Sequence, residues 1–257
     1  MKNKVVFSLI VIVIFVVLAG CNPAPNSTPP SSTGNSGAIS VPAVKDTLAP
    51  SPTSVPTLVS TSTTAPTAAE AEINLNMPAL DILKVAYQNG MKAHSHHEES
   101  SSNINGTTLL SKLDLVSGGN MHSVSTSMNG KNTTTTELIL VDGKYYKKTN
   151  EGAWADITDT YKKQQGDTGL LFTEETLNTI KDAKLMGQES LDGKPMVLIT
   201  YSLDFMKVHF DNKAWIGMSD GLEYKIEMTY LLGNTPVTTT TLYSNYNADI
   251  KIESPIK

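Results

Sequence analysis

The chain contains no arginine and only one cysteine among its 257 residues, and aromatic residues make up only 6%. All 20 basic residues are lysine, so the side chain best suited to bidentate recognition of phosphate or guanine is missing. We therefore expect no nucleic-acid partner. A single cysteine can form neither an intramolecular disulfide nor a thiolate metal cluster, so the folded part must depend on an ordinary core.

Residues 1–20 have the pattern of a signal peptide. Lys2 and Lys4 precede an apolar run of 14 residues, Val5 to Leu18, which is interrupted only by Ser8. A spanning helix needs about 20 apolar residues, so this run is too short to be a mature transmembrane helix.

The segment Leu18-Ala19-Gly20-Cys21 follows at once and resembles a bacterial lipobox. This resemblance implies cleavage before Cys21, acylation of Cys21, and anchoring on the extracytoplasmic side of the cell membrane. Two or more acyl chains hold a protein on a membrane lastingly, whereas one chain is marginal. A plain secretory signal with an incidental cysteine is the alternative.

Residues 21–72 form the predicted lipidated cysteine and tether. Residues 22–72 hold nine of the 13 prolines and no aromatic residue, and they consist largely of Pro, Ser, Thr and Ala. Such a segment cannot offset the entropy of ordering, so we expect a disordered spacer of polyproline character. A glycosylated stalk with no other role fits the same composition.

Residues 73–257 read as one α+β domain with an antiparallel sheet. In the segment from Leu222 to Tyr230, apolar and polar residues alternate, which places five apolar side chains on one strand face. Glycine turn pairs such as Asn105-Gly106 and Asp142-Gly143 favour tight hairpins, and two tetrathreonine runs suit strands. The further predicted strands are Leu109 to Val116, Glu137 to Val141, Pro195 to Leu203, Lys213 to Met218, Pro236 to Tyr243 and Asp249 to Glu253.

Two segments have helical character instead. Pro78 fits the first turn of a helix that places Leu80, Leu83, Tyr87 and Met91 on one face. A second helix is predicted after Thr173, with Phe172 packed against Leu177. Both must pack on the sheet to be stable. We therefore predict a long, curved antiparallel sheet, or half-barrel, with helices on its concave face.

The order of these segments resembles a known family. The relevant segments are Val141 to Tyr146, Trp154, Asp220 to Ile226, Tyr243 to Asn247 and Ile252 to Pro255. Together with the lipobox and tether, they are similar to mycobacterial lipoproteins of the LppX and LprG type. They are more distantly similar to the LolA and LolB lipoprotein-localisation factors.

The resemblance implies a half-barrel around helices with an apolar cavity for acyl chains. We therefore predict a non-enzymatic protein, without cofactor or metal, that binds a lipid or other hydrophobic ligand and could transfer it. Leu80, Leu83, Tyr87, Leu177 and Ile180 could line the cavity, although core packing is the default interpretation for such a stripe. The alternative function is a structural or sensory module that binds an envelope protein or cell-wall polymer.

The densest cluster of titratable residues is His94, His96 and His97 with Glu98 and Glu99. In a strand, His94, His96 and Glu98 would share one face and could hold zinc. A solvated first strand is favoured, because no residue that would orient these ligands is identifiable. The sequence Asp167-Thr168-Gly169 copies an aspartic-protease tripeptide, but it follows a polar segment and has no second copy, so we read it as a loop.

The remaining charged groups have plain explanations. Adjacent Glu174 and Glu175 diverge around a helix and suit its N-terminal dipole better than they suit acid–base catalysis. The lysines of residues 144–148 could touch anionic lipid headgroups beside Tyr145 and Tyr146, or simply form a solvated hairpin face. No nucleophile elbow, phosphate loop or dinucleotide fingerprint is present in the sequence.

Overall fold

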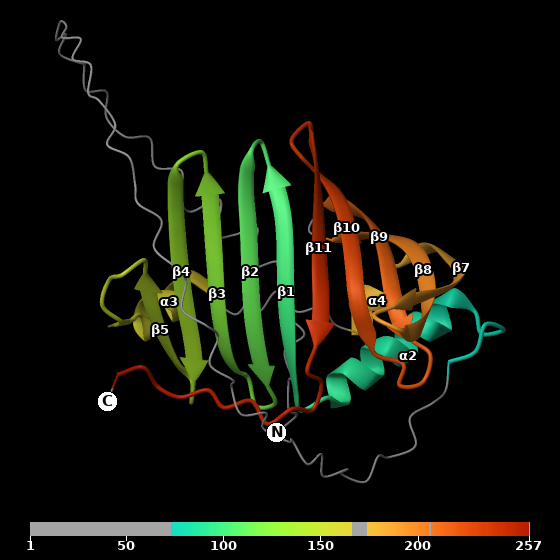
Figure 1. Cartoon of the computed structure of the whole chain (residues 1–257), viewed down its shortest axis with the longest axis horizontal. Helices are drawn as coiled ribbons and strands as arrows, with labels where there is room; N and C mark the ends of the chain where they lie inside the picture. Colours follow the sequence, from blue (N-terminus) through green and yellow to red (C-terminus); the bar gives the residue numbers. More distant parts are fainter. Residues whose placement is uncertain (1–72, 166–173, 206, 257) are drawn as a thin grey trace, which may run out of the picture.

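The computed structural model describes residues 73–165, 174–205 and 207–256. The predicted signal peptide, the tether and Cys21 lie outside the described residues, as do Phe172, Thr173 and the tripeptide Asp167-Thr168-Gly169. Figure 1 shows the described part as one broad sheet with helices near its two ends.

The described residues form three helices and eleven strands, so the fold is mostly β. In chain order the elements are α2 (Ala79–Lys92), β1 (Ser95–Ile104), β2 (Thr107–Val116), β3 (Asn120–Asn129), β4 (Asn132–Val141), β5 (Lys144–Thr149), β6 (Ala155–Asp156), α3 (Thr158–Gln165), α4 (Glu174–Leu177), β7 (Lys181–Leu191), β8 (Lys194–Phe205), β9 (Val208–Gly217), β10 (Glu223–Leu232) and β11 (Thr235–Ser244).

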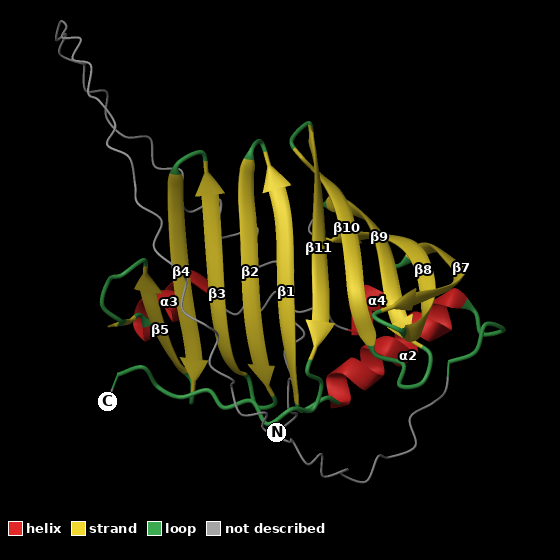
Figure 2. Cartoon of the chain, viewed as in Figure 1, coloured by secondary structure: helices red, strands yellow, loops and turns green. Residues whose placement is uncertain are grey.

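All eleven strands belong to a single open antiparallel sheet (Figure 2). Its order is β6-β5-β4-β3-β2-β1-β11-β10-β9-β8-β7, so the sheet consists of two consecutive meanders that meet where β1 pairs with β11. The prediction of an antiparallel sheet with helices is confirmed.

Tight turns set the register of the hairpins. Asn105 and Gly106 both have positive φ angles, 52° and 80°, and join β1 to β2. Asp142 and Gly143 do the same between β4 and β5, with φ of 52° and 74°. Asparagine, aspartate and glycine tolerate this backbone region best, and the resulting turn twist matches that of paired strands. The predicted turns at these pairs are confirmed.

Two local predictions need correction, and one helix was not predicted. The segment Asp249 to Glu253 is not a strand, because β11 already pairs with β1 and β10 and leaves no open edge beside it. Instead, Ile252 packs on Ile139, Val141 and Tyr146. The second predicted helix, α4, spans only four residues, and the sequence analysis missed α3.

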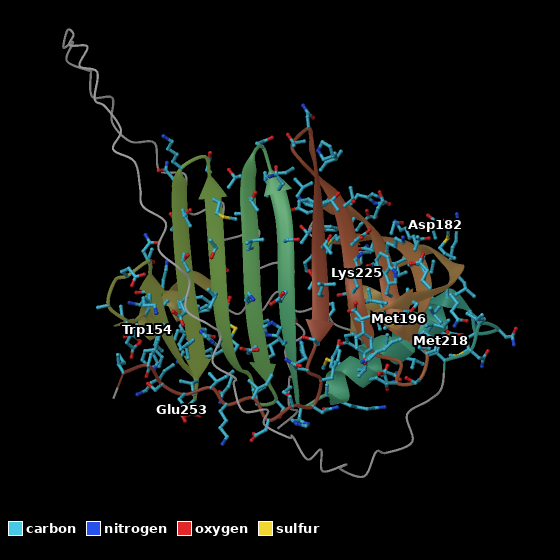
Figure 3. All side chains as sticks on the ribbon, viewed as in Figure 1. Trp154, Asp182, Met196, Met218, Lys225 and Glu253 are labelled. Atoms are coloured by element: carbon cyan, nitrogen blue, oxygen red, sulfur yellow. The ribbon has the colours of Figure 1, made fainter. Side chains whose placement is uncertain are left out.

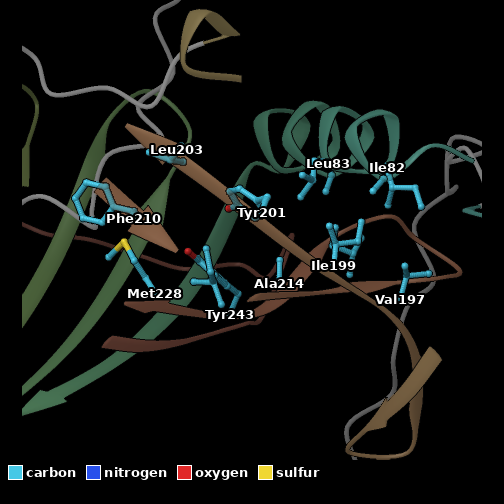
Figure 4. Close-up of a cluster of buried hydrophobic side chains, with 14 of the residues drawn as sticks. Ile82, Leu83, Val197, Ile199, Tyr201, Leu203, Phe210, Ala214, Met228 and Tyr243 are labelled. Atoms are coloured by element: carbon cyan, nitrogen blue, oxygen red, sulfur yellow. The ribbon is translucent and has the colours of Figure 1, made fainter. Parts of the chain in front are cut away.

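Helix α2 packs on β7 and β10 and covers the main core (Figure 4). Its buried face contains Ala79, Ile82, Leu83 and Ala86, whose spacing brings them onto one side of the helix. The members of the core cluster on β8 to β11 are Val197, Ile199, Tyr201, Leu203, Phe210, Ala214, Ile216, Ile226, Met228, Tyr230, Val237 and Tyr243.

We call the side of the sheet that α2 covers the inner face and the opposite side the outer face. The outer face of β1 to β4 carries ion pairs, with Lys112 2.7 Å from Glu99 and His122 2.8 Å from Glu137, and a small apolar cluster around Ile139. Each of these surface ion pairs contributes little to stability. Their charged groups favour exposure of this face to solvent. An apolar site is therefore expected on the inner face.

A second apolar cluster lies on the outer face of the other meander. Met196 and Trp215 are buried there, and the ammonium group of Lys225 lies 4.2 Å from the Trp215 ring centroid. Figure 3 labels Met196 and Lys225. The lysine stem covers the indole, so this cluster is closed by its own side chains.

Candidate functional site

An apolar patch continues the inner face beyond the helix-covered core. We define this inner patch by the residues Leu113, Leu115, Met121, Leu138 and Leu140, which come from β2, β3 and β4. Strand register places them together, because Met121 lies opposite both Leu115 and Leu140, and Ser123 lies opposite both Leu113 and Leu138. The period of two along each strand then turns all five toward the same side.

The inner patch lies between two helices on the same face. Helix α2 packs on β7 and β10, whereas α3 packs on β5 at the other end of the sheet. The α3 contact includes Tyr161 stacked on Tyr145 with ring centroids 4.1 Å apart. Tyr145 lies opposite Leu140 and therefore shares the inner face with the patch. The helices thus flank the strands that carry the patch.

Small hydroxyl side chains extend the inner face along the same strands. Ser111 lies opposite Ser100 and Ser125, and the hydroxyl groups of Ser100 and Thr241 are 2.8 Å apart. These side chains rise less far from the sheet than leucine or phenylalanine would. The inner face therefore combines an apolar patch with an area of small polar side chains. This combination suits an elongated amphipathic ligand.

A polar cluster borders the inner patch on its β1 side. Strand register places His96 opposite Leu115 and Glu98 opposite Leu113, so the cluster and the patch adjoin. The cluster consists of His96, Glu98, Tyr201, Glu223, Tyr243 and Tyr246.

Its hydrogen bonds connect β1, β10, β11 and the segment after β11. His96 Nε2 lies 2.9 Å from Glu98 Oε1, and both side chains are buried. The Tyr246 hydroxyl donates to the Glu223 carbonyl at 2.5 Å, and its ring lies 5.6 Å from that of His96. Tyr243 lies directly opposite Glu98 and hydrogen bonds the Glu223 carboxyl.

Burial changes the protonation of this cluster. Desolvation and the nearby Glu98 charge raise the pKa of Glu223 to about 8, while the hydrogen bond from Tyr243 acts against them. Glu223 keeps some accessible surface as a residue, but protein atoms surround its carboxyl group. Burial also raises the pKa values of Tyr201, Tyr243 and Tyr246 well above that of free tyrosine, so their hydroxyls stay protonated donors.

The alternation of residues from Leu222 to Tyr230 predicts Glu223 on the solvent side of a regular strand, and this prediction is wrong. The register shifts between Glu223 and Lys225, and this bulge turns Glu223 inward and Tyr224 outward, where it packs on the Met196 cluster. Of the five predicted inward residues, only Ile226, Met228 and Tyr230 join the main core.

The predicted cavity-lining residues lie near the main core. Leu83 belongs to the core under α2, Ile180 packs against it, and Leu177 is buried. Leu80 and Tyr87 are half-buried, and Ile82, which the sequence analysis did not select, is fully buried on α2. Their contact with a ligand stays a prediction. Lipid attachment at Cys21 also stays a prediction, because Cys21 lies outside the described residues.

The histidines of the predicted titratable cluster separate. His96 and Glu98 point to the inner face, whereas His97 contacts Asp114 at 2.7 Å on the outer face. His94 is exposed and precedes β1. Across residues 73–165, 174–205 and 207–256, no group of three or more His, Cys, Asp or Glu side chains is placed to hold a metal ion.

The lysine-rich segment of residues 144–148 divides between the two faces. Tyr146 is buried on the outer face, where Lys148 pairs with Glu137 and lies 4.8 Å from the Trp154 ring. Tyr145 faces inward, and Lys144 and Lys147 are exposed. Contact between this hairpin and anionic lipid headgroups stays a prediction.

The described fold defines the class: an open antiparallel sheet of 11 strands with helices packed on it. Within the described residues, no helix has the length and apolar character needed to cross a membrane. No family model matches the chain, and no curated protein matches it in sequence.

Solved structures show the resemblance predicted from the sequence. LprF from Mycobacterium bovis is 14% identical, with 69% of this chain and 96% of that chain covered and a TM-score of 0.49. The lipoprotein LppX from Mycobacterium tuberculosis is 13% identical, with 68% and 98% covered and a TM-score of 0.49. A LolA superfamily protein from Nitrosomonas europaea is 11% identical, with 68% and 95% covered and a TM-score of 0.27.

Proposed function

We propose that the chain is a membrane-anchored extracytoplasmic lipoprotein that binds the hydrocarbon part of a lipid on the inner patch. In this proposal the sheet curves as a half-barrel with α2 and α3 on its concave side. Residues 1–20 are the signal peptide, residues 21–72 carry acylated Cys21 and the tether, and residues 73–257 bind the ligand. Binding requires no cofactor and no covalent chemistry, and the bound lipid is passed on between envelope components.

The position of the inner patch carries this proposal. Five apolar side chains gather on the face that both α2 and α3 use, but on strands that lie between the strands these helices pack on. Leu113, Leu115 and Met121 are buried, whereas Leu138 and Leu140 are only partly buried. Covering the exposed part of these two leucines with an acyl chain gains about 25 cal/mol per Å² of apolar area removed from water.

A pair of leucine substitutions tests the proposal. Leu140→Asp places a charge in the inner patch, whereas Leu110→Asp changes an exposed leucine on the outer face of β2. Purified full-length chains are extracted with organic solvent, and the lipid per protein is measured by mass spectrometry. We expect about one lipid per wild-type chain, the same for Leu110→Asp, and at least about a tenfold loss for Leu140→Asp.

Other outcomes contradict the proposal. A wild-type chain without co-purified lipid, or equal lipid in both variants, rules out the inner patch as a lipid site. Circular dichroism of both variants checks that they remain folded. A stoichiometric protein or polymer partner captured by crosslinking, without lipid, supports the alternative of an envelope interaction module.

A further inference from the structure

The pairing of β1 with β11 holds the two halves of the sheet together. One half runs through residues 95–156 and the other through residues 181–244, and within each half every neighbouring pair of strands is consecutive in the chain. The junction runs from His97 opposite Ser244 to Ser102 opposite Thr239. Among the described strands, no other pairing connects the halves.

The polar cluster occupies the inner face at one end of this junction. Glu98 of β1 and Tyr243 of β11 are direct partners across it. Glu223 reaches them from β10 through the bulge, and Tyr246 ties the segment after β11 to the Glu223 backbone. Four separate elements therefore meet at buried polar groups, and such groups are costly when their partners change.

Glu223 faces one acidic group and several weak acids. The titratable groups that act on it or respond to it are Glu98 from β1, Tyr201 from β8, Tyr243 from β11 and Tyr246 from the following segment, with His96 paired to Glu98.

Other charged groups near the start of β10 have partners of their own. Lys225, on the same strand, pairs with Glu227 at 2.7 Å and lies over Trp215 on the outer face. Asp220, on the turn before β10, accepts a hydrogen bond from Tyr224 at 2.6 Å. An ionised Glu223 thus meets the Glu98 charge, and the lysine of its own strand points away.

We propose that ionisation of Glu223 beside Glu98 loosens the junction of β1 with β11, so that the two halves of the sheet are joined more weakly in alkaline than in acidic solution. In the closed junction Glu223 is protonated and neutral below about pH 8, because burial and Glu98 disfavour its charge. When the junction opens to water, Glu223 releases its proton, so each rise in pH up to about 8 favours opening.

Hydrogen exchange of the full chain tests this proposal. Exchange is followed by mass spectrometry from about pH 6 to about pH 9 and corrected for the intrinsic pH dependence of amide exchange. We expect protection in β1 and β11 to fall as pH rises from about 6, by up to about tenfold per pH unit, and to level off above about pH 8, where Glu223 is ionised in the closed junction as well. Protection between β2 and β3, distant from Glu223, serves as the reference and stays constant.

Three variants identify the titrating group. Glu223→Gln abolishes the fall, and Glu98→Gln lowers the pH at which protection levels off, because the repelling charge is gone. Glu227→Gln, on the outer face of the same strand, leaves that pH unchanged. A loss of protection that is the same in Glu223→Gln as in the wild type, or constant protection in the wild type, overturns the proposal. Carbon NMR of labelled glutamate in the wild type is an independent check: the absence of a carboxyl titrating between about pH 7 and 9 also overturns it.

Discussion

Glu223 shows how one backbone irregularity changes the chemistry of a residue. In a regular strand its carboxyl would face water together with Glu227. The bulge before Lys225 instead turns it into the polar cluster, where burial and Glu98 raise its pKa to about 8. A carboxyl of this kind is protonated in the folded chain at neutral pH and ionised in the unfolded chain.

Glu223→Gln is expected to reduce the pH dependence of stability. Between pH 4.5, the ordinary pKa of glutamic acid, and about pH 8, the folded state holds a proton that the unfolded state has released. The free energy of unfolding therefore falls as pH rises through this window, by at least about 1 kcal/mol. Urea unfolding across the window should show this decline in the wild type and a flatter profile in Glu223→Gln. A decline of equal size in both chains would exclude Glu223 as its source.

Tyr246→Phe tests a hydrogen bond of the same cluster. Removing the hydroxyl leaves the part-buried Glu223 carbonyl without this donor, which should lower the free energy of unfolding by about 1 to 2 kcal/mol. Tyr145→Phe is the matched control, because it keeps the ring stacked on Tyr161 and should change stability by less than about 0.5 kcal/mol. Denaturant titration distinguishes the two. Equal stabilities would show that the Tyr246 hydroxyl contributes nothing.

At the scale of elements, α2 is held by a narrow set of side chains. Ile82 is fully buried against the sheet, whereas Leu80, two residues earlier, is half-buried. The difference follows from helical geometry, since residues two apart lie about 200° apart around the axis.

Alanine substitutions on α2 should reflect this difference. Ile82→Ala removes buried methyl groups and leaves a cavity, so it should lower the free energy of unfolding by about 2 to 5 kcal/mol. Leu80→Ala should cost less than about 1.5 kcal/mol, because part of its surface is already in water. Denaturant unfolding of both variants measures the two values. A larger loss for Leu80→Ala would contradict the orientation of α2.

Much of the fold was predictable because its signals are local. The hairpin turn at Asn105-Gly106 requires residues that accept positive φ, and the start of α2 is marked by Pro78. The register bulge at Glu223 was not predictable, because nothing in the alternation of residues marks it. Helix α3 was not predicted because its residues are almost all polar and Tyr161 is its one aromatic residue. The inner patch depends on pairing between strands, which single-strand patterns do not contain.

At the scale of the whole molecule, the two faces of the sheet differ in what they offer. The outer face carries ion pairs and the closed Trp215 cluster, whereas the inner face carries the main core, the polar cluster and the inner patch in sequence across its strands. In the proposed function, an apolar ligand binds on the inner face of β2, β3 and β4, between the helices at the two ends of this face.

Photocrosslinking tests this central claim most directly. The full chain is incubated with a fatty acid that carries a photoreactive group near the end of its hydrocarbon chain, irradiated, digested and analysed by mass spectrometry. The account predicts modified residues on the inner face of β2, β3 and β4, at Leu113, Met121, Leu138 or their inner-face neighbours. Modification confined to the outer face, at Leu110 or Leu242, or no specific modification at all, would contradict it.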